Sequence, residues 1–411
     1  MSLIQTFRAY RPKPEFAARV ASVPYDVINT AEARQLAEGN PYSFLHVCRP
    51  EIDLPVGIDE HEDRVYAMGA ANLKKFVADG ILGREDGDSF YVYQQRMGEH
   101  VQAGLVALCS VAEYEENRIK KHEFTRRDKE DDRTRHVTEQ NANAEPVFLT
   151  YRAQTAIDAI VDAARASAPL YDIMTPDRIA HTVWRIADPA TIARLIELFG
   201  GVAALYIADG HHRTASAVRY AQACRARNPH PTGKEPYESF MAVVFPHNQL
   251  KIFDYNRVVK DLNGLAPEQL LAKIGEKFEV GPAANRQPSR AASFGMYLQG
   301  KWYTLKARAG SYPADDPIKR LDVSILQDNL LSPVLGIHDQ RTDKRIDFVG
   351  GIRGMDELER RVKEGYAVAF SLYPTSLDQL IDVADAGEVM PPKSTWFEPK
   401  LRSGLLVRLY E

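Results

Sequence analysis

Cysteine is scarce in this chain of 411 residues: only Cys48, Cys109 and Cys224 occur, far apart and odd in number. A disulfide framework needs paired cysteines, so we expect three reduced thiols and a cytoplasmic protein. Long apolar runs are also missing. No stretch of about 18 uninterrupted apolar residues occurs, which argues against a membrane span. The N-terminus lacks the apolar core and cleavage site of a signal peptide.

An excess of charge of either sign is absent too. The 52 Lys and Arg residues nearly balance the 56 Asp and Glu residues, for a net charge of −4. Such a chain has no global field that attracts nucleic acid or anionic lipid. We therefore expect neither a nucleic acid nor a membrane as partner, and the sequence leaves the oligomeric state open.

Several well-known catalytic patterns are missing. No GxGxxG follows a predicted strand, which excludes a Rossmann dinucleotide site, and no glycine-rich Walker A loop occurs. The Gly-x-Ser-x-Gly elbow of acyl-transfer enzymes is absent as well. Without CxxC or HExxH spacing we expect no protein-bound metal, although Asp209 and His211 with His122 or His136 would offer a His/carboxylate set.

What remains is an ordinary globular composition, with 45% apolar and 26% charged residues. Predicted strands and helices mix without a regular βαβ rhythm, which favours an α+β fold of mixed sheets with peripheral helices. We expect a hairpin over residues 89–114 and a short strand that ends at Val47. The length predicts a site-bearing region over residues 1–235 and a second α+β region, with a C-terminal binding loop, over residues 236–411.

The most informative segment runs from Ala208 to Thr214, with the sequence Ala-Asp-Gly-His-His-Arg-Thr. An apolar run precedes it and a helical pattern follows, so it is typical of a buried strand, a glycine turn and a helix start. The first N–H groups of a helix lack partners and carry partial positive charge, which favours an anion such as phosphate. An alternative is a plain aspartate N-cap with exposed histidines. The residues that we expect at this site are Asp209, Gly210, His211, His212, Arg213 and Thr214.

Residues 118–136 form a strongly charged segment. A solvated, salt-bridged helix or a mobile loop would explain it. The segment would instead supply acids, bases and phosphate-neutralising cations if it reached the same cleft. The candidates in it are Lys121, His122, Glu123, Arg133 and His136.

Two proline-containing segments add candidates. Asp26 follows Pro24 on a rigid extended turn, where it would act as a general base, bind an amine, or only cap the next helix. Residues 390–400 lack any secondary-structure period and combine lysines, hydroxyls and an aromatic residue, as binding loops do. Lys393 or Lys400 would bind phosphate, beside Ser394 and Thr395. Alternatively, this loop only holds the last strand against the core.

With these motifs, the chain resembles the prokaryotic family catalogued as domain of unknown function 1015. The motifs are Pro24–Ile28, Asn40–Phe44, Lys121–Glu123 with Asp132, Arg133 and His136, Asp209–Arg213, Asn256–Val258 and Met390–Lys400. In addition, Gly210–Arg213 resembles the phosphate-binding turn of the ParB and sulfiredoxin-like superfamily. That resemblance implies a phosphate-binding core and nucleotide binding, since some members are kinases of free serine.

The resulting hypothesis is a kinase that transfers a phosphoryl group from ATP or ADP, with Mg²⁺, to a small hydroxylated metabolite such as free L-serine. Arg213 and the Gly210 turn would hold phosphate, and His211 or His212 would stabilise the transferred group. Asp209, Glu123 or Asp26 would accept the hydroxyl proton. The alternatives are a non-catalytic nucleotide sensor and a phosphohydrolase.

Overall fold

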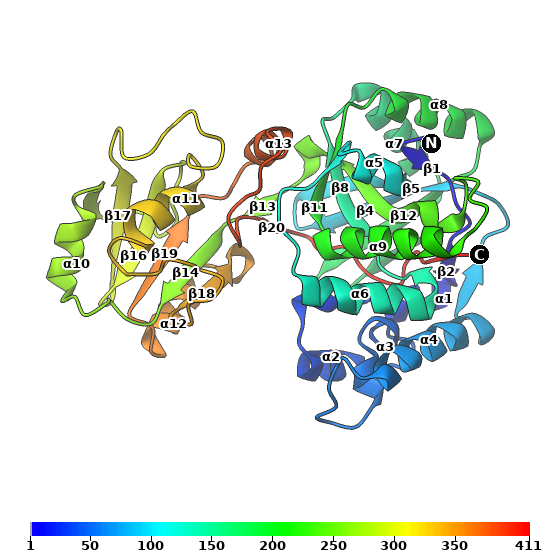
Figure 1. Ribbon diagram of the computed structural model, residues 1–411, viewed down its shortest axis with the longest axis horizontal. Helices are drawn as coiled ribbons and strands as arrows, with labels where there is room; N and C mark the ends of the chain where they lie inside the picture. The colour runs from blue at the N-terminus through cyan, green and yellow to red at the C-terminus, as the bar shows by residue number, and fades with distance from the viewer. Residues whose placement is uncertain (1) are drawn as a thin grey trace. The chain divides into compact units, whose positions relative to one another are not determined.

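The computed structural model describes residues 2–411 and divides into two compact units. The first unit runs to Leu250 and also contains Pro399–Glu411, and the second unit is Lys251–Glu398. The boundary that we expected after residue 235 precedes a strand of the first unit's sheet, and the chain's last residues return to that unit. The mixture of sheets and peripheral helices confirms the α+β class (Figure 1).

A nine-stranded mixed sheet forms the centre of the first unit, in the order β6-β11-β8-β12-β5-β4-β10-β9, with β1 paired to β5. The hairpin expected over residues 89–114 is its β4–β5 pair, although a short helix, α5, takes the last residues of that range. The strands are β1 (Ile4–Gln5), β4 (Phe90–Met97), β5 (His100–Ser110), β6 (Ile119–Lys120), β8 (Val147–Tyr151), β9 (Tyr171–Met174), β10 (Ile179–Ile186), β11 (Leu205–Asp209) and β12 (Ser239–Pro246).

Helices cover one face of this sheet. Alternate strand residues such as Leu105, Leu149 and Val244 form a core with apolar residues of α7, α8 and α9, because successive side chains of a strand point to opposite faces. Val106 and Val243 lie on the other face, near Leu405 and Leu406 of the C-terminal segment. The larger helices are α6 (Arg127–Gln140), α7 (Thr155–Arg165), α8 (Pro189–Gly200) and α9 (His211–Arg227), with the short α5 (Val111–Glu115) beside them.

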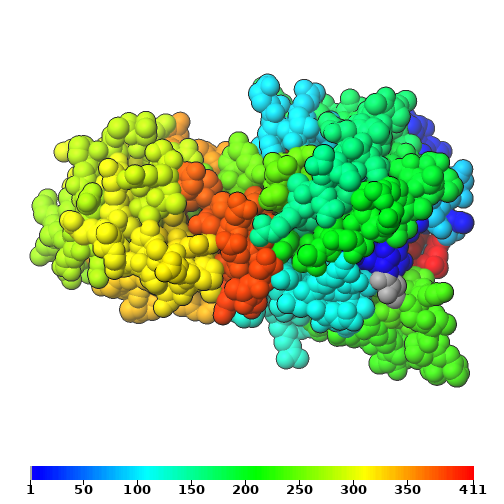
Figure 2. Space-filling model, turned by 90° about the horizontal axis from the view of Figure 1, so that it is seen from above, coloured from blue at the N-terminus to red at the C-terminus, as the bar shows by residue number. Residues whose placement is uncertain are grey.

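A second core lies under the N-terminal helices, where α4 packs against α6. The chain ends meet here: Tyr10 pairs with Val407, and Figure 2 shows the red C-terminal atoms beside blue N-terminal ones. The elements are β2 (Tyr10–Pro12), α1 (Pro14–Val20), α2 (Thr30–Ala37), α3 (Leu45–Cys48), α4 (Asp63–Ala78), β3 (Leu82–Arg84), β7 (Ala142–Asn143) and β21 (Arg408–Leu409).

The strand expected to end at Val47 is wrong, because residues Leu45–Cys48 form the helical turn α3. The apolar side chains of this segment resemble a buried strand in sequence. In the structure Leu45, Val47 and Cys48 are all buried within the second core, so a helical turn surrounded by other helices hides them equally well.

The second unit contains a six-stranded antiparallel sheet, in the order β15-β17-β16-β19-β14-β18, and a two-stranded pair of β13 and β20. Helix α12 packs on the central strands of the six-stranded sheet. The elements are β13 (Ile252–Phe253), β14 (Tyr255–Val259), α10 (Pro267–Ile274), β15 (Phe278–Pro282), β16 (Ser293–Leu298), β17 (Lys301–Ala307), α11 (Asp322–Leu326), β18 (Ile346–Gly350), α12 (Met355–Lys363), β19 (Val368–Leu372), α13 (Leu377–Asp385) and β20 (Trp396–Phe397).

Strand pairing in the first unit gathers the polar segments at one edge of the sheet. Strand β6 runs parallel to β11, so the residues after β6 and the residues after β11 leave the sheet at the same end. Strand β8 is antiparallel to β11 and therefore begins there. The register shifts between Ile207 and Asp209, a bulge that re-aims the end of β11.

The three cysteines are free thiols, as expected. Over residues 2–411, the model contains no helix with both the length and the apolar character of a membrane span.

Close packing in the sheet predicts that Gly104 of β5 resists enlargement. A Cβ atom at this position would lie 2.8 Å from the Phe245 ring in the neighbouring strand. We expect Gly104→Val to reduce the free energy of unfolding by about 1–3 kcal/mol. Gly83→Ala is the matched control in β3, since its Cβ meets nothing within 4 Å. Urea denaturation of both variants tests this, and equal stability of the two would contradict it.

Candidate functional site

The turn between β11 and α9 has the conformation that its sequence predicts. Gly210 adopts φ +92°, a left-handed conformation that residues with a Cβ rarely tolerate. Among the residues that the structure describes, no side chain caps α9 through a hydrogen bond to its first turn. Asp209 instead accepts the Gly210 N–H at 2.9 Å through its Oδ1. The start of α9 thus keeps the electropositive end that an anion can use.

Arg213 lies on the first turn of α9 and is only 8% exposed. Its Nη1 donates to the carbonyl oxygen of Pro146, just before β8, while Nε and Nη2 have no hydrogen-bond partner among the described residues. Its Nη2 lies 3.6 Å from Asp26 Oδ2 and 3.7 Å from Asp209 Oδ2. Burial opposes the charge, but these carboxylates outweigh it and raise the pKa of Arg213.

Both carboxylate oxygens of Asp209 have a partner. While Oδ1 accepts from Gly210, Oδ2 lies 3.1 Å from the Lys400 ammonium. Burial alone would raise the pKa of Asp209, but Lys400 and Arg213 hold it well below its usual range. A carboxylate with such a low pKa is a weak proton acceptor, so Asp209 is suited to orienting the cations around it.

Both histidines of the turn face the charged segment that follows β6. His211 is buried, and its Nε2 accepts the backbone N–H of His122 at 3.4 Å. The Nε2 of His212 accepts the backbone N–H of Arg126 at 3.1 Å. Burial lowers the pKa of both histidines, so both are neutral at neutral pH. The structure thus brings the residues that follow β6 next to this turn.

Glu123 and Asp26 are the accessible carboxylates of the arrangement. The side chain of Glu123 is 46% exposed and its Oε2 lies 3.9 Å from His211 Nδ1. The side chain of Asp26 is 35% exposed beside Arg213. Solvent therefore reaches the site past these two residues.

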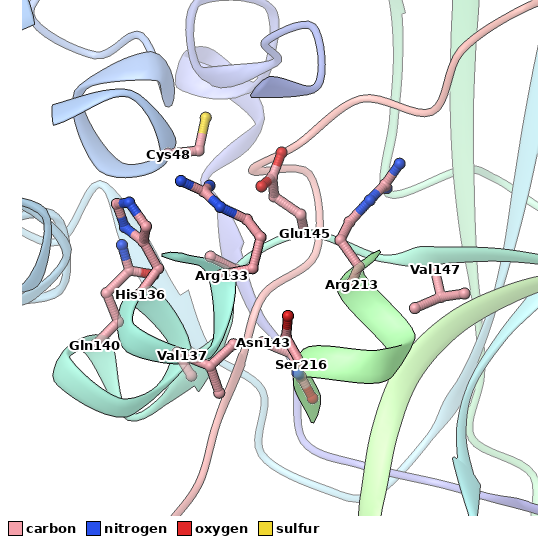
Figure 3. A pocket seen from close by; sticks show the side chains of 12 residues that line it. Cys48, Arg133, His136, Val137, Gln140, Asn143, Glu145, Val147, Arg213 and Ser216 are labelled. Atoms are coloured by element: carbon pink, nitrogen blue, oxygen red, sulfur yellow. The ribbon is translucent and has the colours of Figure 1, made fainter. Parts of the chain in front are cut away.

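Arg133 and His136 lie on α6, and both are buried. Arg133 pairs with Asp132 at 2.7 Å and its guanidinium lies 4.0 Å from the centre of the Tyr25 ring. Figure 3 shows the Glu145 carboxylate between the guanidinium groups of Arg133 and Arg213. These side chains line a cavity of about 40 Å³, enough for water but far too small for a nucleotide. The predicted ligand contacts of Arg133 and His136 stay predictions.

The other candidates remain as predictions as well. Lys121 is exposed, and the Thr214 hydroxyl is fully buried and donates to the Gly210 carbonyl. Lys393, Ser394 and Thr395 belong to the second unit. There the Lys393 carbonyl accepts from Arg257, and the Ser394 carbonyl accepts from Thr375.

Sequence reasoning missed Glu145. Its Oε1 accepts from the Tyr25 N–H and the Ser403 hydroxyl, and burial raises its pKa despite Arg213 and Arg133. An acidic residue directly before Pro146 and the apolar β8 was the available signal. Lys400 was considered only beside Lys393, because nothing in the sequence says that residues 399–411 return to the first unit.

Comparisons with known proteins place this chain in a family. A model described as "Protein of unknown function (DUF1015)" matches residues 4–324, so the chain belongs to that family, as its motifs predicted. A comparison with curated proteins found no match.

Solved structures give distant likenesses. A free serine kinase in complex with AMP is 15% identical, with a TM-score of 0.38, over 74% of this chain and 91% of that one. A C-terminally truncated SbnI from Staphylococcus aureus is 12% identical, with a TM-score of 0.38, over 74% of this chain and 87% of that one. A conserved hypothetical protein from Pyrococcus furiosus is 16% identical with a TM-score of 0.35, over 74% and 95%.

The turn's geometry predicts a specific effect of Gly210→Ala. The new Cβ would need a left-handed φ and would lie 3.1 Å from Arg213 Nε. We expect a loss of about 1–2 kcal/mol of unfolding free energy. Gly201→Ala, where the backbone is right-handed and the nearest atom is 3.4 Å away, is the control and should change stability by less than about 0.5 kcal/mol. Chemical denaturation measures both variants, and an unchanged free energy of unfolding for Gly210→Ala would contradict the geometry.

Proposed function

We propose that this protein is a nucleotide-dependent kinase that phosphorylates a hydroxyl group of a small metabolite. The observation that carries the proposal is the Arg213 guanidinium, which is buried at the start of α9 and has two nitrogens without a hydrogen-bond partner among residues 2–411. Buried donors are normally paired, so this guanidinium is prepared for an acceptor with several oxygens. Phosphate matches it in charge and in its ability to accept two parallel bonds.

The surrounding charges support a nucleotide that arrives with Mg²⁺. Asp26, Asp209 and Glu123 would repel an uncompensated polyphosphate, while Arg213 and Lys400 attract it. Mg²⁺ bound to the phosphates offsets the carboxylate charge and needs only one or two protein carboxylates. ATP or ADP would therefore bind as its magnesium complex.

The reaction itself needs few groups. The acceptor oxygen forms a bond to the terminal phosphorus, the bond from that phosphorus to the bridging oxygen breaks, and AMP or ADP leaves with the bonding electrons. The acceptor's hydroxyl proton passes to a carboxylate. Asp26 and Glu123 are the accessible choices, since both Asp209 oxygens are engaged. His211 and His212 lie beside the turn to stabilise the transferred group.

Free L-serine is the first acceptor to test, because the likeness of Gly210–Arg213 to the phosphate-binding turn of free serine kinases implies it. Phosphorus NMR of the protein with ADP or ATP, Mg²⁺ and a panel of hydroxylated amino and hydroxy acids tests the reaction. A kinase forms a phosphomonoester only when the acceptor is present. Phosphate release without acceptor would indicate a hydrolase, and binding without turnover a sensor.

Removal of the guanidinium should abolish tight nucleotide binding. We expect Arg213→Ala to weaken the affinity for Mg·ADP or Mg·ATP at least tenfold, because a charge-assisted bidentate contact contributes about 1.5–3 kcal/mol. Arg219→Ala is the control on the same helix, since Arg219 pairs with Glu130 and Asp131 near the surface. Calorimetry measures both, and equal affinities for the two variants would contradict the phosphate assignment.

Neutralising the accessible carboxylates should separate binding from chemistry. We expect Asp26→Asn or Glu123→Gln, whichever removes the proton acceptor, to lower kcat by about 10²–10⁴-fold while Mg·nucleotide affinity changes less than threefold. Steady-state assays with calorimetry on each variant test this. If both variants keep wild-type kcat, neither carboxylate is the base and the proposed chemistry fails.

A further inference from the structure

A second chemical feature lies beside the phosphate turn: His122, Glu123 and His211 each present a ligand atom, and these atoms all lie within 4.8 Å of one another. The fold brings them together because β6 and β11 are parallel and end at the same edge. His122 and Glu123 follow β6, and His211 follows β11 by way of Gly210. Residues from two separate strand ends thus converge on one point.

The His122 ring supplies independent evidence that something is bound there. Its side chain is buried, with the residue only 1% exposed, and neither Nδ1 nor Nε2 makes a hydrogen bond of ordinary geometry among the described residues, although the ring interacts weakly with the Ile207 backbone. A buried polar atom without a partner costs about 1–3 kcal/mol, and most such atoms in folded proteins are satisfied by protein, water or an ion. The ring lies edge-on to His211, with centroids 4.5 Å apart, so its nitrogens belong to the same cluster.

From this arrangement, we propose that His122, Glu123 and His211 bind a divalent transition-metal ion. Two imidazoles and one carboxylate suit Zn²⁺ and its first-row neighbours and not Mg²⁺, which prefers oxygen ligands. This site is therefore distinct from the Mg²⁺ that accompanies a nucleotide, and it departs from the absence of a protein-bound metal that the sequence spacing predicts. The inference holds whether or not the protein is a kinase.

To bind an ion, the three ligand atoms have to move closer to one another than the 4.8 Å within which they lie. Ligand atoms around a tetrahedral Zn²⁺ lie about 3.3 Å apart, given bonds of about 2.0–2.1 Å. His211 Nδ1 lies 3.9 Å from Glu123 Oε2, and Glu123 lies outside any helix or strand, with its side chain 46% exposed. Coordination through Nδ1 needs the tautomer protonated at Nε2, so the 3.4 Å contact of Nε2 with the His122 backbone N–H has to open. Rotation of the Glu123 side chain brings its carboxylate toward the buried rings, and its half-exposed side leaves a fourth position for water or a ligand oxygen.

The electrostatics agree with the geometry. Imidazole binds a metal ion in its neutral form. Asp209 and Glu123 face the rings with negative charge, while Arg213 and His212 adjoin His211 on the other side. The two carboxylates, Asp209 and Glu123, offset the positive charge of Arg213 and of Lys400, which pairs with Asp209.

The test uses the full-length protein stripped with a chelator and dialysed, titrated with Zn²⁺ and with Co²⁺ alone. We expect one ion per chain by calorimetry, and a Co²⁺ absorption spectrum of low coordination number. His122→Ala and Glu123→Gln should each weaken binding at least tenfold. His136→Ala is the matched control, because His136 is equally buried and also has an unpartnered ring nitrogen, but lies outside the cluster. It should change affinity less than twofold.

Two results would overturn the proposal: no stoichiometric binding by the stripped wild-type protein, or wild-type affinity in both His122→Ala and Glu123→Gln. Glu123→Gln keeps the test decisive if His122→Ala does not fold, because Glu123 is half-exposed and its replacement is isosteric. X-ray absorption of the zinc-loaded protein should show two imidazole ligands. The proposed kinase chemistry is judged separately, by nucleotide binding to Arg213→Ala.

Discussion

The buried guanidinium of Arg213 is the constraint on which the site depends. A lone buried cation is costly, and this one is compensated by carboxylates from three separate segments, Asp26, Glu145 and Asp209. Its one hydrogen bond goes to the Pro146 carbonyl, at the start of β8. The N-terminal region, the beginning of β8 and the end of β11 are therefore tied to a single charge, and the glycine turn fixes where that charge lies.

A partly satisfied charge of this kind has a functional consequence. Within the described part of the chain, two guanidinium nitrogens remain without hydrogen-bond partners although carboxylate oxygens lie within 4 Å. A purely structural ion pair would close those contacts, because the low dielectric around it rewards direct bonds. The open geometry is instead what a site needs when a ligand supplies the missing acceptors. The ring nitrogens of His122, which contacts His211 of the same turn, also lack an ordinary hydrogen bond among the described residues and repeat the pattern with a different ligand chemistry.

The sequence predicted much of this local chemistry and little of its assembly. The strand, glycine turn and helix around Gly210 were predictable because apolar periodicity and a glycine at a left-handed position are local properties. The β4–β5 hairpin was predictable for the same reason. Helix α3 was mistaken for a strand, since a segment of four residues, three of them buried, fits either period. Glu145 was missed, and Lys400 was named only as an alternative to Lys393, because their roles arise from long-range pairing, of β8 with β11 and of the C-terminal segment with the first unit.

The most direct test of the account is a crystal structure of the protein with Mg·ADP. The account predicts a phosphate oxygen within about 3 Å of Arg213 Nε or Nη2 and of a backbone N–H in the first turn of α9. A nucleotide whose phosphates bind elsewhere, with the Arg213 nitrogens still unpartnered, would contradict it.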